Sequence, residues 1–469
     1  MDINKYIFYG EVFSSGESYP LEAAYGSRNS LLVKFDNSRW IADNTEFEKL
    51  TLNITGVDFT FSRCLFLYEH DIPNFKGRLI FIEDVYDFHT IIEYKVNSNL
   101  ETYFQNLPMV FGQKQKIKEQ FRQYTSDLTY DLMVYQKHFD ELDSMYKSEP
   151  ANVYKKVQET IVKVQGAKFF AYFDEKLDEL KRITVNFTLE EHENHAYFFR
   201  RQVWNFILAS SFITRTNMKP RGYAGDSEMM SIIYRNLYEG DTIFQQLMHK
   251  HPIETKSAQA VRNRKMLIPK KVEEARLEFF GEEEPFRIFS VASGAAREIE
   301  NVIISPDSCR KIDLTLLDQD HEALAEAELC IQRVENRFGA KIEHKFIYES
   351  VRTMLRLKNI DEHWGQFHFI YSMGLFDYLS PRVAQAVIEK LYELLLPGGT
   401  MVIGNYHEAN PTKTYMDYWC DWVLYYRSED DFLEITKNLK GCKKDIVFDE
   451  TGCQMFLTLN KQRSDKNKI

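Results

Sequence analysis

The sequence predicts an α/β domain at its C-terminal end, preceded by a helical segment and a small β-barrel-like domain. Three observations predict this order. Short branched and aromatic runs fill the first part of the chain, helical periodicity follows, and strand and helix patterns then alternate to the end. We expect four parts: a β-rich domain (1–112), a helical hairpin or linker (113–182), a second helical segment (183–271) and the α/β domain (272–469).

The composition is typical of a soluble globular protein. Apolar residues make up 44% of the 469 residues, charged residues make up 28%, and the net charge is −11. This charge argues against nucleic acid as the main partner, because no basic face is evident. The six cysteines show no CxxC and no zinc-like spacing with histidine, so we expect no metal and a reducing cytoplasm. No signal-peptide pattern and no run of about 18 apolar residues occurs, which predicts no membrane insertion.

The first 112 residues alternate strand-like runs with turn residues. The runs 30–35, 50–54 and 78–82 are short and rich in branched or aromatic residues. Their order resembles the PilZ barrel that binds cyclic di-GMP in bacteria. The paired arginines of that family are absent, since Arg28 stands alone, and its D/N-x-S-x-x-G turn is replaced by NITG at 53–56. We therefore expect a PilZ-like barrel that does not bind a cyclic dinucleotide.

An apolar seam then indicates a long helix. Its positions are spaced alternately by four and three residues, at Leu128, Leu132, Tyr135, Phe139, Leu142 and Tyr146. Pro150 interrupts the pattern, and a second amphipathic helix starts near Val153, which predicts a helical hairpin. Two interpretations stay open: a hairpin packed within its own subunit, or a coiled coil that joins two subunits. The N-terminal region is the other candidate surface for a homodimer.

The α/β part opens with a strand, a tight turn and a helix. The apolar run 286–291 is followed by ASGAA at 292–296 and then by a helical pattern. A loop in this place can cradle a nucleotide-like ligand at a helix N-terminus. It holds one glycine, whereas the dinucleotide-binding pattern G-x-G-x-x-G holds three.

Four more strands are expected after this turn. The second, 312–317, ends in Asp318, and a carboxylate there can accept hydrogen bonds from a ribose diol. The third is expected at 342–347 and the fourth at 367–372. After a helix that begins at Ser380-Pro381, the PGG turn leads to the fifth strand at 400–405.

These features together resemble the class I S-adenosylmethionine-dependent methyltransferases, over about residues 272–460. The carrying motifs are the ASGAA turn, the acid-terminated second strand, and LLPGGTMVIGN after S-x-G-x-x-D-Y-L. The resemblance implies a Rossmann-like fold with S-adenosylmethionine as cofactor. It implies that Ser293, Gly294 and Ala295 contact the methionine part of the cofactor and that Glu298 contacts its ammonium group. Asp318 would bind the ribose, Gln319 would lie along the adenosine, and Ser350 and Val351 would reach the adenine edge. Ser372, Met373 and Gly374 would lie beneath the sulfonium.

Each of these positions also has a plainer interpretation. Ser293-Gly294 can be only a βα turn, Asp318 only a helix cap, and Met373 only a core side chain. Ser290 stands where many members of the family have an acid at the end of the first strand.

Three further strings narrow the resemblance. KPRGYAGD at 219–226, AVRNR at 260–264 and the run 404–427 are similar to the bacterial extracellular-factor family, which is associated with 3-hydroxy fatty acid methyl ester biosynthesis, over about 185–440. The resemblance implies a hydroxy fatty acid or another small metabolite as methyl acceptor. It also implies that the segment 183–271 is a helical lid over the cofactor, to which Tyr223, Asp226 and Arg262 belong.

The candidate catalytic residues follow the strands, because ligands bind at the carboxyl ends of strands in such sheets. His407 is a candidate base or orienting group, with Asp226 as a second base. Tyr425 and Arg427 can hold a carboxylate or phenolate. The alternatives are a packed histidine, a surface ion pair and a structural loop; Trp419 and Trp422 either line an acceptor pocket or pack in the core.

The sequence therefore predicts a cytoplasmic bacterial enzyme that transfers a methyl group from S-adenosylmethionine to an oxygen or nitrogen of a small molecule. Catalysis in such a transfer consists mainly of positioning the reactants. The alternative is a catalytically silent S-adenosylmethionine-binding regulatory protein. A nicotinamide-dependent oxidoreductase is disfavoured by the one-glycine turn and the PGG strand.

Overall fold

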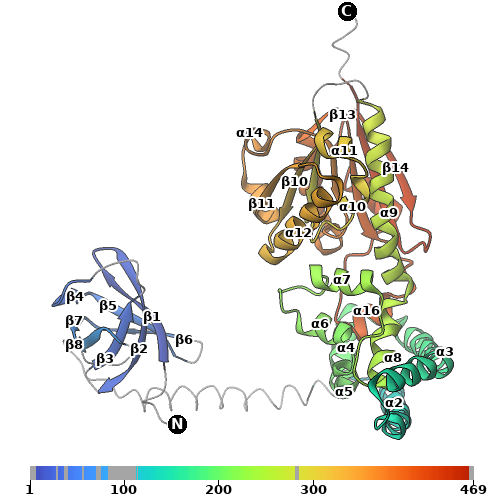
Figure 1. Cartoon of the computed structure of the whole chain (residues 1–469), viewed down its shortest axis with the longest axis horizontal. Helices are drawn as coiled ribbons and strands as arrows, with labels where there is room; N and C mark the ends of the chain where they lie inside the picture. The colour runs from blue at the N-terminus through green and yellow to red at the C-terminus, as the bar shows by residue number, and fades with distance from the viewer. Residues whose placement is uncertain are drawn as a thin grey trace, which may run out of the picture. The chain divides into compact units, whose positions relative to one another are not determined.

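The computed structural model describes residues 7–27, 30–35, 41–54, 57–69, 75–82, 112, 115–279 and 285–463. The chain divides into two compact units, residues 1–115 and 116–469, both drawn in Figure 1. The four-part division expected from the sequence stays a prediction; its last three parts fall in the second unit from residue 116 onward.

The N-terminal unit contains an antiparallel sheet with one buried face. In β3 the side chains of Leu31, Val33 and Phe35 are buried, whereas those of Leu32 and Lys34 are half-buried, as alternation across a strand requires. The described strands follow the order β4-β7-β8-β3-β2-β1-β5-β6. Their bounds are β1 (Ile7–Ser14), β2 (Glu17–Ser27), β3 (Ser30–Phe35), β4 (Thr45–Phe47), β5 (Lys49–Ile54), β6 (Val57–Phe61), β7 (Cys64–Tyr68) and β8 (Gly77–Phe81).

The expected closed barrel is not confirmed. The end strands β4 and β6 are not hydrogen-bonded to each other in the part of the chain that the structure describes, so the sheet is open. Arg28, Thr55 and Gly56, on which the comparison with PilZ barrels depends, lie outside the described residues.

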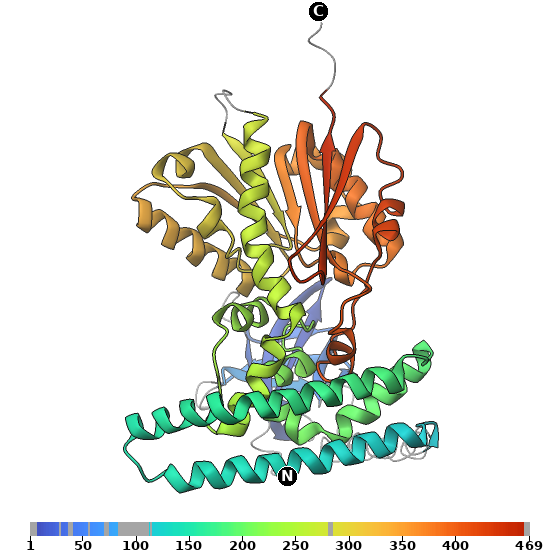
Figure 2. The ribbon, with the colours of Figure 1, turned by 90° about the vertical axis from the view of Figure 1, so that its right-hand side faces the viewer.

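The second unit begins with a helical layer that has its own hydrophobic core (Figure 2). The apolar seam of α2 faces this core, since Leu128, Leu132 and Phe139 are buried and α2 contacts α3 and α8. This favours the interpretation that the hairpin packs within its own subunit. The helices of this layer are α2 (Glu119–Tyr146), α3 (Ala151–Thr184), α4 (Leu189–Gln202), α5 (Trp204–Leu208), α6 (Ser211–Met218), α7 (Ser227–Arg235), α8 (Ile243–Ile253) and α16 (Lys413–Tyr418).

The rest of the second unit is α/β, as expected. Its sheet has the order β11-β10-β9-β12-β13-β15-β14, and the described pairs are parallel except those of β15. The chain order reverses between β9 and β12, which opens a crevice at the carboxyl ends of these strands. The strands are β9 (Phe286–Val291), β10 (Ile312–Asp318), β11 (Glu343–Tyr348), β12 (Phe367–Ser372), β13 (Leu395–Tyr406), β14 (Cys442–Phe448) and β15 (Gln454–Lys461).

Helices cover both faces of this sheet. Helices α9 to α12 share a core with one face, and α13, α15 and α17 share a core with the other. All six residues of β12 are buried, as a strand covered on both faces requires. These helices are α9 (Lys256–Leu277), α10 (Ile299–Val302), α11 (Pro306–Lys311), α12 (His321–Phe338), α13 (Val351–Arg356), α14 (Ile360–Trp364), α15 (Pro381–Glu393) and α17 (Glu429–Glu434).

The fifth strand of the α/β part starts earlier than the sequence indicated. β13 begins at Leu395 rather than Thr400, so Pro397 and the two glycines that follow lie within its bounds. Across the described ranges, no helix is both long and apolar enough to cross a bilayer. Nor do the His, Cys, Asp and Glu side chains of those ranges form a group suited to a metal ion.

Candidate functional site

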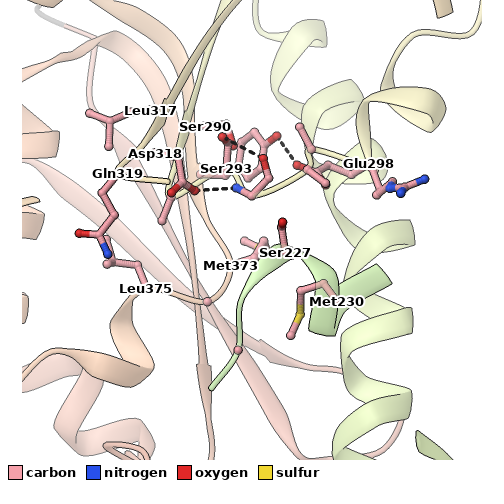
Figure 3. A pocket seen from close by; sticks show the side chains of 18 of the residues that line it. Ser227, Met230, Ser290, Ser293, Glu298, Leu317, Asp318, Gln319, Met373 and Leu375 are labelled. Atoms are coloured by element: carbon pink, nitrogen blue, oxygen red, sulfur yellow. Dashed lines mark hydrogen bonds between the residues drawn. The ribbon is translucent and has the colours of Figure 1, made fainter. Parts of the chain in front are cut away.

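A cavity of about 610 Å³ lies at the carboxyl ends of β9, β10 and β12 (Figure 3). One wall consists of the loops that follow these strands, and we call it the strand wall. The other consists of the loop 219–226, α7 and α9, and we call it the helical wall. The volume is in the range of small-molecule sites. Eleven predicted site residues line the cavity: Tyr223, Ser293, Gly294, Ala295, Glu298, Asp318, Gln319, Ser350, Val351, Met373 and Gly374.

The turn after β9 contains three left-handed residues. Ala292, Gly294 and Ala296 have φ angles of 54°, 54° and 47°. Glycine adopts this conformation freely, whereas alanine does so at a cost, and such strain is concentrated at ligand sites. A Cβ atom on Gly294 would meet no atom within 4 Å, so the space beside this backbone is open. The turn therefore has three left-handed positions although it holds one glycine.

Asp318 joins the ends of β9 and β10. Its carboxylate accepts the backbone N–H of Gly294 at 2.8 Å and that of Asp320 at 3.0 Å. Burial raises the pKa of Asp318, and these two N–H donors oppose the effect. A carboxylate offers about four acceptor positions. Positions therefore remain for hydroxyl groups of a ligand in the cavity.

Glu298 and Arg264 carry opposite charges and line the cavity, as do Arg297, Glu349 and Arg352. Among the described residues, neither Glu298 nor Arg264 lies within ion-pair distance of a partner, and Arg264 donates a hydrogen bond to the carbonyl oxygen of Met373 at 3.2 Å. Burial raises the pKa of Glu298. Burial lowers the pKa of Arg264, but nearby Tyr234 and Asp377 outweigh it, and the pKa lies above its ordinary value. A ligand that carries both a cation and an anion matches this arrangement.

A hydrogen-bond chain links Glu298 to the end of β9. The hydroxyl of Tyr371 donates to Glu298 Oε1 at 2.6 Å, and Ser290 is hydrogen-bonded to Tyr371. The buried Ser290 also lines the cavity. The acid that is absent at Ser290 is therefore present nearby, supplied by the residue before α10.

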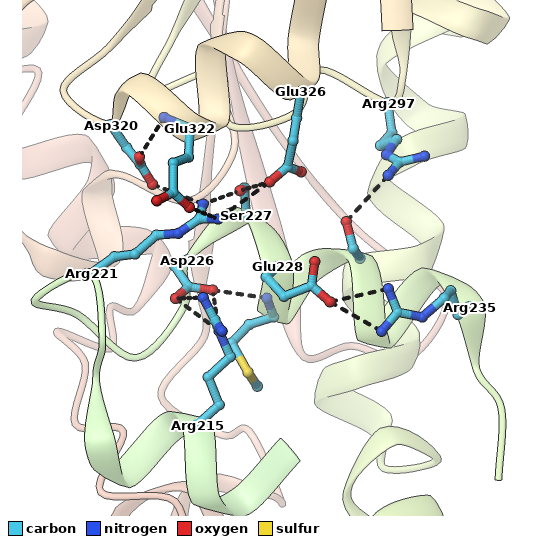
Figure 4. Close-up of polar contacts among 12 residues, drawn as sticks. Arg215, Arg221, Asp226, Ser227, Glu228, Arg235, Arg297, Asp320, Glu322 and Glu326 are labelled. Carbon is cyan, nitrogen blue, oxygen red and sulfur yellow. Dashed lines mark hydrogen bonds and ion pairs between the residues drawn. The ribbon is translucent and has the colours of Figure 1, made fainter. Parts of the chain in front are cut away.

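The loop 219–226 is tied to α12 through Arg221 (Figure 4). Its guanidinium contacts Asp320 at 3.0 Å, Glu322 at 2.5 Å and Glu326 at 3.4 Å. Ser227, the first residue of α7, accepts a hydrogen bond from Arg221 at 2.6 Å and donates one to Glu326 at 2.9 Å. Side-chain contacts of charged groups thus hold the helical wall over the cavity.

Asp226 belongs to the same loop but does not line the cavity. It is fully buried, and its two oxygens contact Arg215 at 2.9 Å and 2.8 Å. One oxygen also accepts the N–H of Met229 at 2.9 Å, which caps α7. Both oxygens have partners. Asp226 therefore caps α7 and does not act as the base that the sequence suggested.

Ser372 and Arg262 also lie away from the cavity. Ser372 is 1% exposed and donates a hydrogen bond to the carbonyl oxygen of Val291 at 2.8 Å, between β12 and β9. Arg262 donates to Gln259 at 2.8 Å and to the carbonyl oxygen of Ile253 at 2.7 Å. Both side chains stabilise the elements that carry the cavity rather than facing into it.

The three candidates after β13 are separate from the cavity as well. His407 contacts Glu429 at 3.1 Å, and Tyr425 is 49% exposed. Arg427 is buried and donates to carbonyl oxygens at both ends of the turn 376–379, at 2.7 and 2.5 Å. Arg427 therefore stabilises the turn after β12 and does not line the cavity.

Sequence reasoning selected Arg262 and missed Arg264. Residues two apart on a helix point to different sides, so one string cannot show which of them faces a ligand. Arg264 lies one turn before Ile268 and two turns before Val272, which are buried against the sheet. That spacing is the signal that identifies the inward face of α9. Also missed were Met230, Tyr234 and Tyr378.

No family model and no curated protein matches the chain. Solved structures with partial likeness include several S-adenosylmethionine-dependent methyltransferases. A possible exported protein from Bordetella parapertussis is 13% identical over 50% of this chain and 79% of its own, with a TM-score of 0.39. Magnesium protoporphyrin IX methyltransferase from Synechocystis PCC 6803 with bound S-adenosylhomocysteine is 12% identical over 51% and 96%, with a TM-score of 0.35. The N-methyltransferase NodS from Bradyrhizobium japonicum WM9 is 11% identical over 41% and 96%, with a TM-score of 0.29.

Proposed function

We propose that the second unit binds S-adenosylmethionine and transfers its methyl group to an oxygen or nitrogen atom of a small molecule. One observation supports this above others: a single cavity collects an acid at the end of β10, Asp318, together with the oppositely charged Glu298 and Arg264.

The residues present fit the polar parts of that cofactor. A ribose diol can donate hydrogen bonds to the free acceptor positions of Asp318. The amino-acid end carries an ammonium and a carboxylate, for which Glu298 and Arg264 are suitable partners. The open space beside Gly294 admits a ligand close to the backbone. Ser350, which caps α13, lines the cavity on the side proposed for the adenine.

The bound cofactor supplies a methyl carbon that is made electrophilic by its positively charged sulfur. The protein fixes the two reactants relative to each other, which accounts for most of the catalysis in such a transfer. Burial and the nearby Asp318 raise the pKa of Tyr223, so its hydroxyl stays protonated at neutral pH and can donate a hydrogen bond. The loop 219–226 and α7 cover the cavity and limit access of water.

The acceptor that we propose has an aliphatic part. Apolar side chains line the cavity next to the polar groups, so a hydrocarbon chain can be buried there. A hydroxy fatty acid, which the resemblance to the extracellular-factor family implies, is one acceptor of this kind. The apolar lining residues are Met230, Ile268, Leu375 and Leu379.

Calorimetry and a transfer assay test this function. We expect the full chain to release or absorb heat on titration with S-adenosylhomocysteine and to give no signal with NAD. The reverse result would contradict the proposal and favour an oxidoreductase. We then expect transfer of labelled methyl groups to 3-hydroxydecanoate or to a component of a bacterial metabolite extract. Binding without transfer to any acceptor would indicate a silent regulatory protein.

A further inference from the structure

Three segments that lie far apart in the sequence meet at the hydroxyl of Tyr378. Tyr378 ends the short 3-10 helix η2 (Phe376–Tyr378) after β12, Gly225 lies in the loop 219–226, and Trp422 follows α16. Tyr378 and Gly225 both line the cavity, so this meeting point lies at its wall.

The hydrogen bonds of this hydroxyl leave its proton without an acceptor. The indole N–H of Trp422 donates to the Tyr378 oxygen at 2.8 Å, and the backbone N–H of Gly225 donates to the same oxygen. A phenol oxygen has two acceptor positions and one proton to donate. Both acceptor positions are taken, and among the described residues none accepts the proton. The hydroxyl is therefore free to donate to a molecule in the cavity.

Close packing fixes where this hydroxyl lies. A Cβ atom on Gly225 would lie 2.6 Å from the Tyr378 oxygen and 2.6 Å from the Trp422 ring. Only glycine allows the loop to approach so closely. On another side, the ring of Tyr223 packs edge-on against that of Tyr378, with 6.2 Å between centroids. A donor held in this way loses little freedom when it binds a ligand.

The hydroxyl acts as a donor and not as a base. Burial and the neighbouring Asp377 raise the pKa of Tyr378, against the opposing effect of the N–H groups of Trp422 and Gly225. The phenol is therefore protonated at neutral pH. It can bind a lone pair on a ligand, but it cannot take up a proton.

We propose that Tyr378 is the hydrogen-bond donor that holds an oxygen atom of the methyl acceptor, with Gly225 and Trp422 as its positioning residues. This rests on the proposed methyltransferase function. In that function Asp318, Glu298 and Arg264 already match the polar groups of the cofactor, so the Tyr378 proton remains for the acceptor.

The proposal assigns a chemical class to the acceptor. A carboxylate or hydroxyl oxygen carries a lone pair that a phenol can bind, whereas an alkylammonium ion has none. Oxygen acceptors are therefore favoured over amines that are protonated at neutral pH. Carboxylates and hydroxyl groups both offer such a lone pair, and an experiment can distinguish between them.

The test measures acceptor binding to the full chain saturated with S-adenosylhomocysteine. Decanoate, decan-1-ol and decylammonium serve as probes with the same hydrocarbon chain. We expect one or both oxygen probes to bind and decylammonium to bind at least ~10-fold more weakly. Tyr378→Phe removes only the hydroxyl, so binding of the oxygen probe should weaken by about 10-fold for decanoate and by about 3-fold for decan-1-ol. Tyr392→Phe is the control, because its hydroxyl bonds Lys440 and Gly441 carbonyl oxygens away from the cavity.

A second variant tests the positioning residues. Trp422→Phe keeps an aromatic ring but removes the N–H, so it should weaken binding of the oxygen probes in the same direction. In both variants the affinity for S-adenosylhomocysteine should equal that of the parent, which shows that the cavity is intact.

Four results would overturn the inference. These are equal binding of decylammonium and the oxygen probes, no binding of either oxygen probe, parent-like probe binding by Tyr378→Phe, or a loss of S-adenosylhomocysteine affinity in Tyr378→Phe. Failure of the parent chain to bind S-adenosylhomocysteine would instead remove the proposed function itself.

Discussion

The strand wall and the helical wall of the cavity are held by different kinds of interaction. Backbone hydrogen bonds of a sheet buried on both faces position the strand wall, and Asp318 ties its turns together through N–H groups. Charged side chains hold the helical wall. Arg221 contacts Asp320 at the start of α12, and Arg215 contacts Asp226. Backbone bonds in a buried sheet open only with large-scale unfolding, whereas side-chain contacts at a wall can open locally.

This difference assigns separate tasks to the two walls. Under the proposed function, the strand wall should determine how tightly S-adenosylmethionine is held, because its geometry is fixed before binding. The helical wall should contribute one strong contact through Arg264 and should otherwise govern how fast the cofactor leaves. Four predictions sharpen this contrast, from the largest expected effect to the smallest.

Asp318→Ala should have the largest effect. The variant loses the acceptor for the ribose and the carboxylate that orders the Gly294 turn, so the affinity for S-adenosylhomocysteine should fall by at least ~100-fold in calorimetry. Asp313→Ala, at the other end of β10, is the matched control and should bind like the parent. Equal affinity of Asp318→Ala and the parent would remove the strand wall from cofactor binding.

Arg264→Met should weaken binding of S-adenosylhomocysteine by about 30-fold, because a charge-assisted hydrogen bond to the ligand carboxylate is lost. Arg262→Met is the control on the same helix, and it should retain the parent affinity since its side chain lies outside the cavity. If Arg262→Met bound S-adenosylhomocysteine weakly and Arg264→Met bound it like the parent, Arg262 rather than Arg264 would be the residue of α9 that contacts the ligand.

Asp377 gives the strand wall a pH dependence. Burial raises its pKa to about 7, against the opposing N–H of Tyr406 and the charges of Arg264 and Arg427. The folded chain thus keeps a proton that the unfolded chain has already released, so the free energy of unfolding should fall as pH rises from 4 through 7. Over this range the loss should approach about 1.4 kcal/mol for each pH unit.

Asp377→Asn should flatten this pH dependence, because the amide stays neutral over the whole range. Urea unfolding at four pH values between 4 and 8 measures the effect for both proteins. If the free energy of unfolding changed with pH equally in parent and variant, burial would not raise the pKa of Asp377 in the folded chain.

Arg221→Gln should have the smallest effect, on rate rather than on affinity. Loss of its contacts to Asp320 and Glu326 should speed the release of S-adenosylhomocysteine about fivefold in stopped-flow measurements. Arg235→Gln is the control, because Arg235 contacts Glu228 and Glu239 and lies outside the cavity lining. Unchanged release in Arg221→Gln would mean that the helical wall does not control access.

The strand wall was predictable to a large extent. The signals of Gly294 and Asp318 are local: an apolar run, then a small-residue turn or an acid, then a helix. Parallel strands bring their carboxyl ends to one edge, so turns distant in the sequence lie close together without further information. Glu298 was selected through the resemblance to methyltransferases, as the second residue after the turn.

The helical wall and the candidate catalytic residues were predicted less well. Asp226 and Arg427 have the residue types of catalytic groups, but the structure engages them with Arg215 and with backbone carbonyl oxygens. The partner of a charged side chain can come from a segment far away in the sequence. A local sequence pattern therefore cannot predict which partner it has.

The sequence by itself determined the first five strands of the α/β part, β9 to β13, and the turns that carry Gly294 and Asp318, because periodicity and turn chemistry act over neighbouring residues. It did not indicate the antiparallel strands β14 and β15. The tertiary structure alone decided that Arg264 and not Arg262 faces the cavity. It also decided that Gly225 and Trp422 meet at Tyr378. These contacts join segments through packing, and the free energy of packing depends on the whole arrangement rather than on any single stretch of chain.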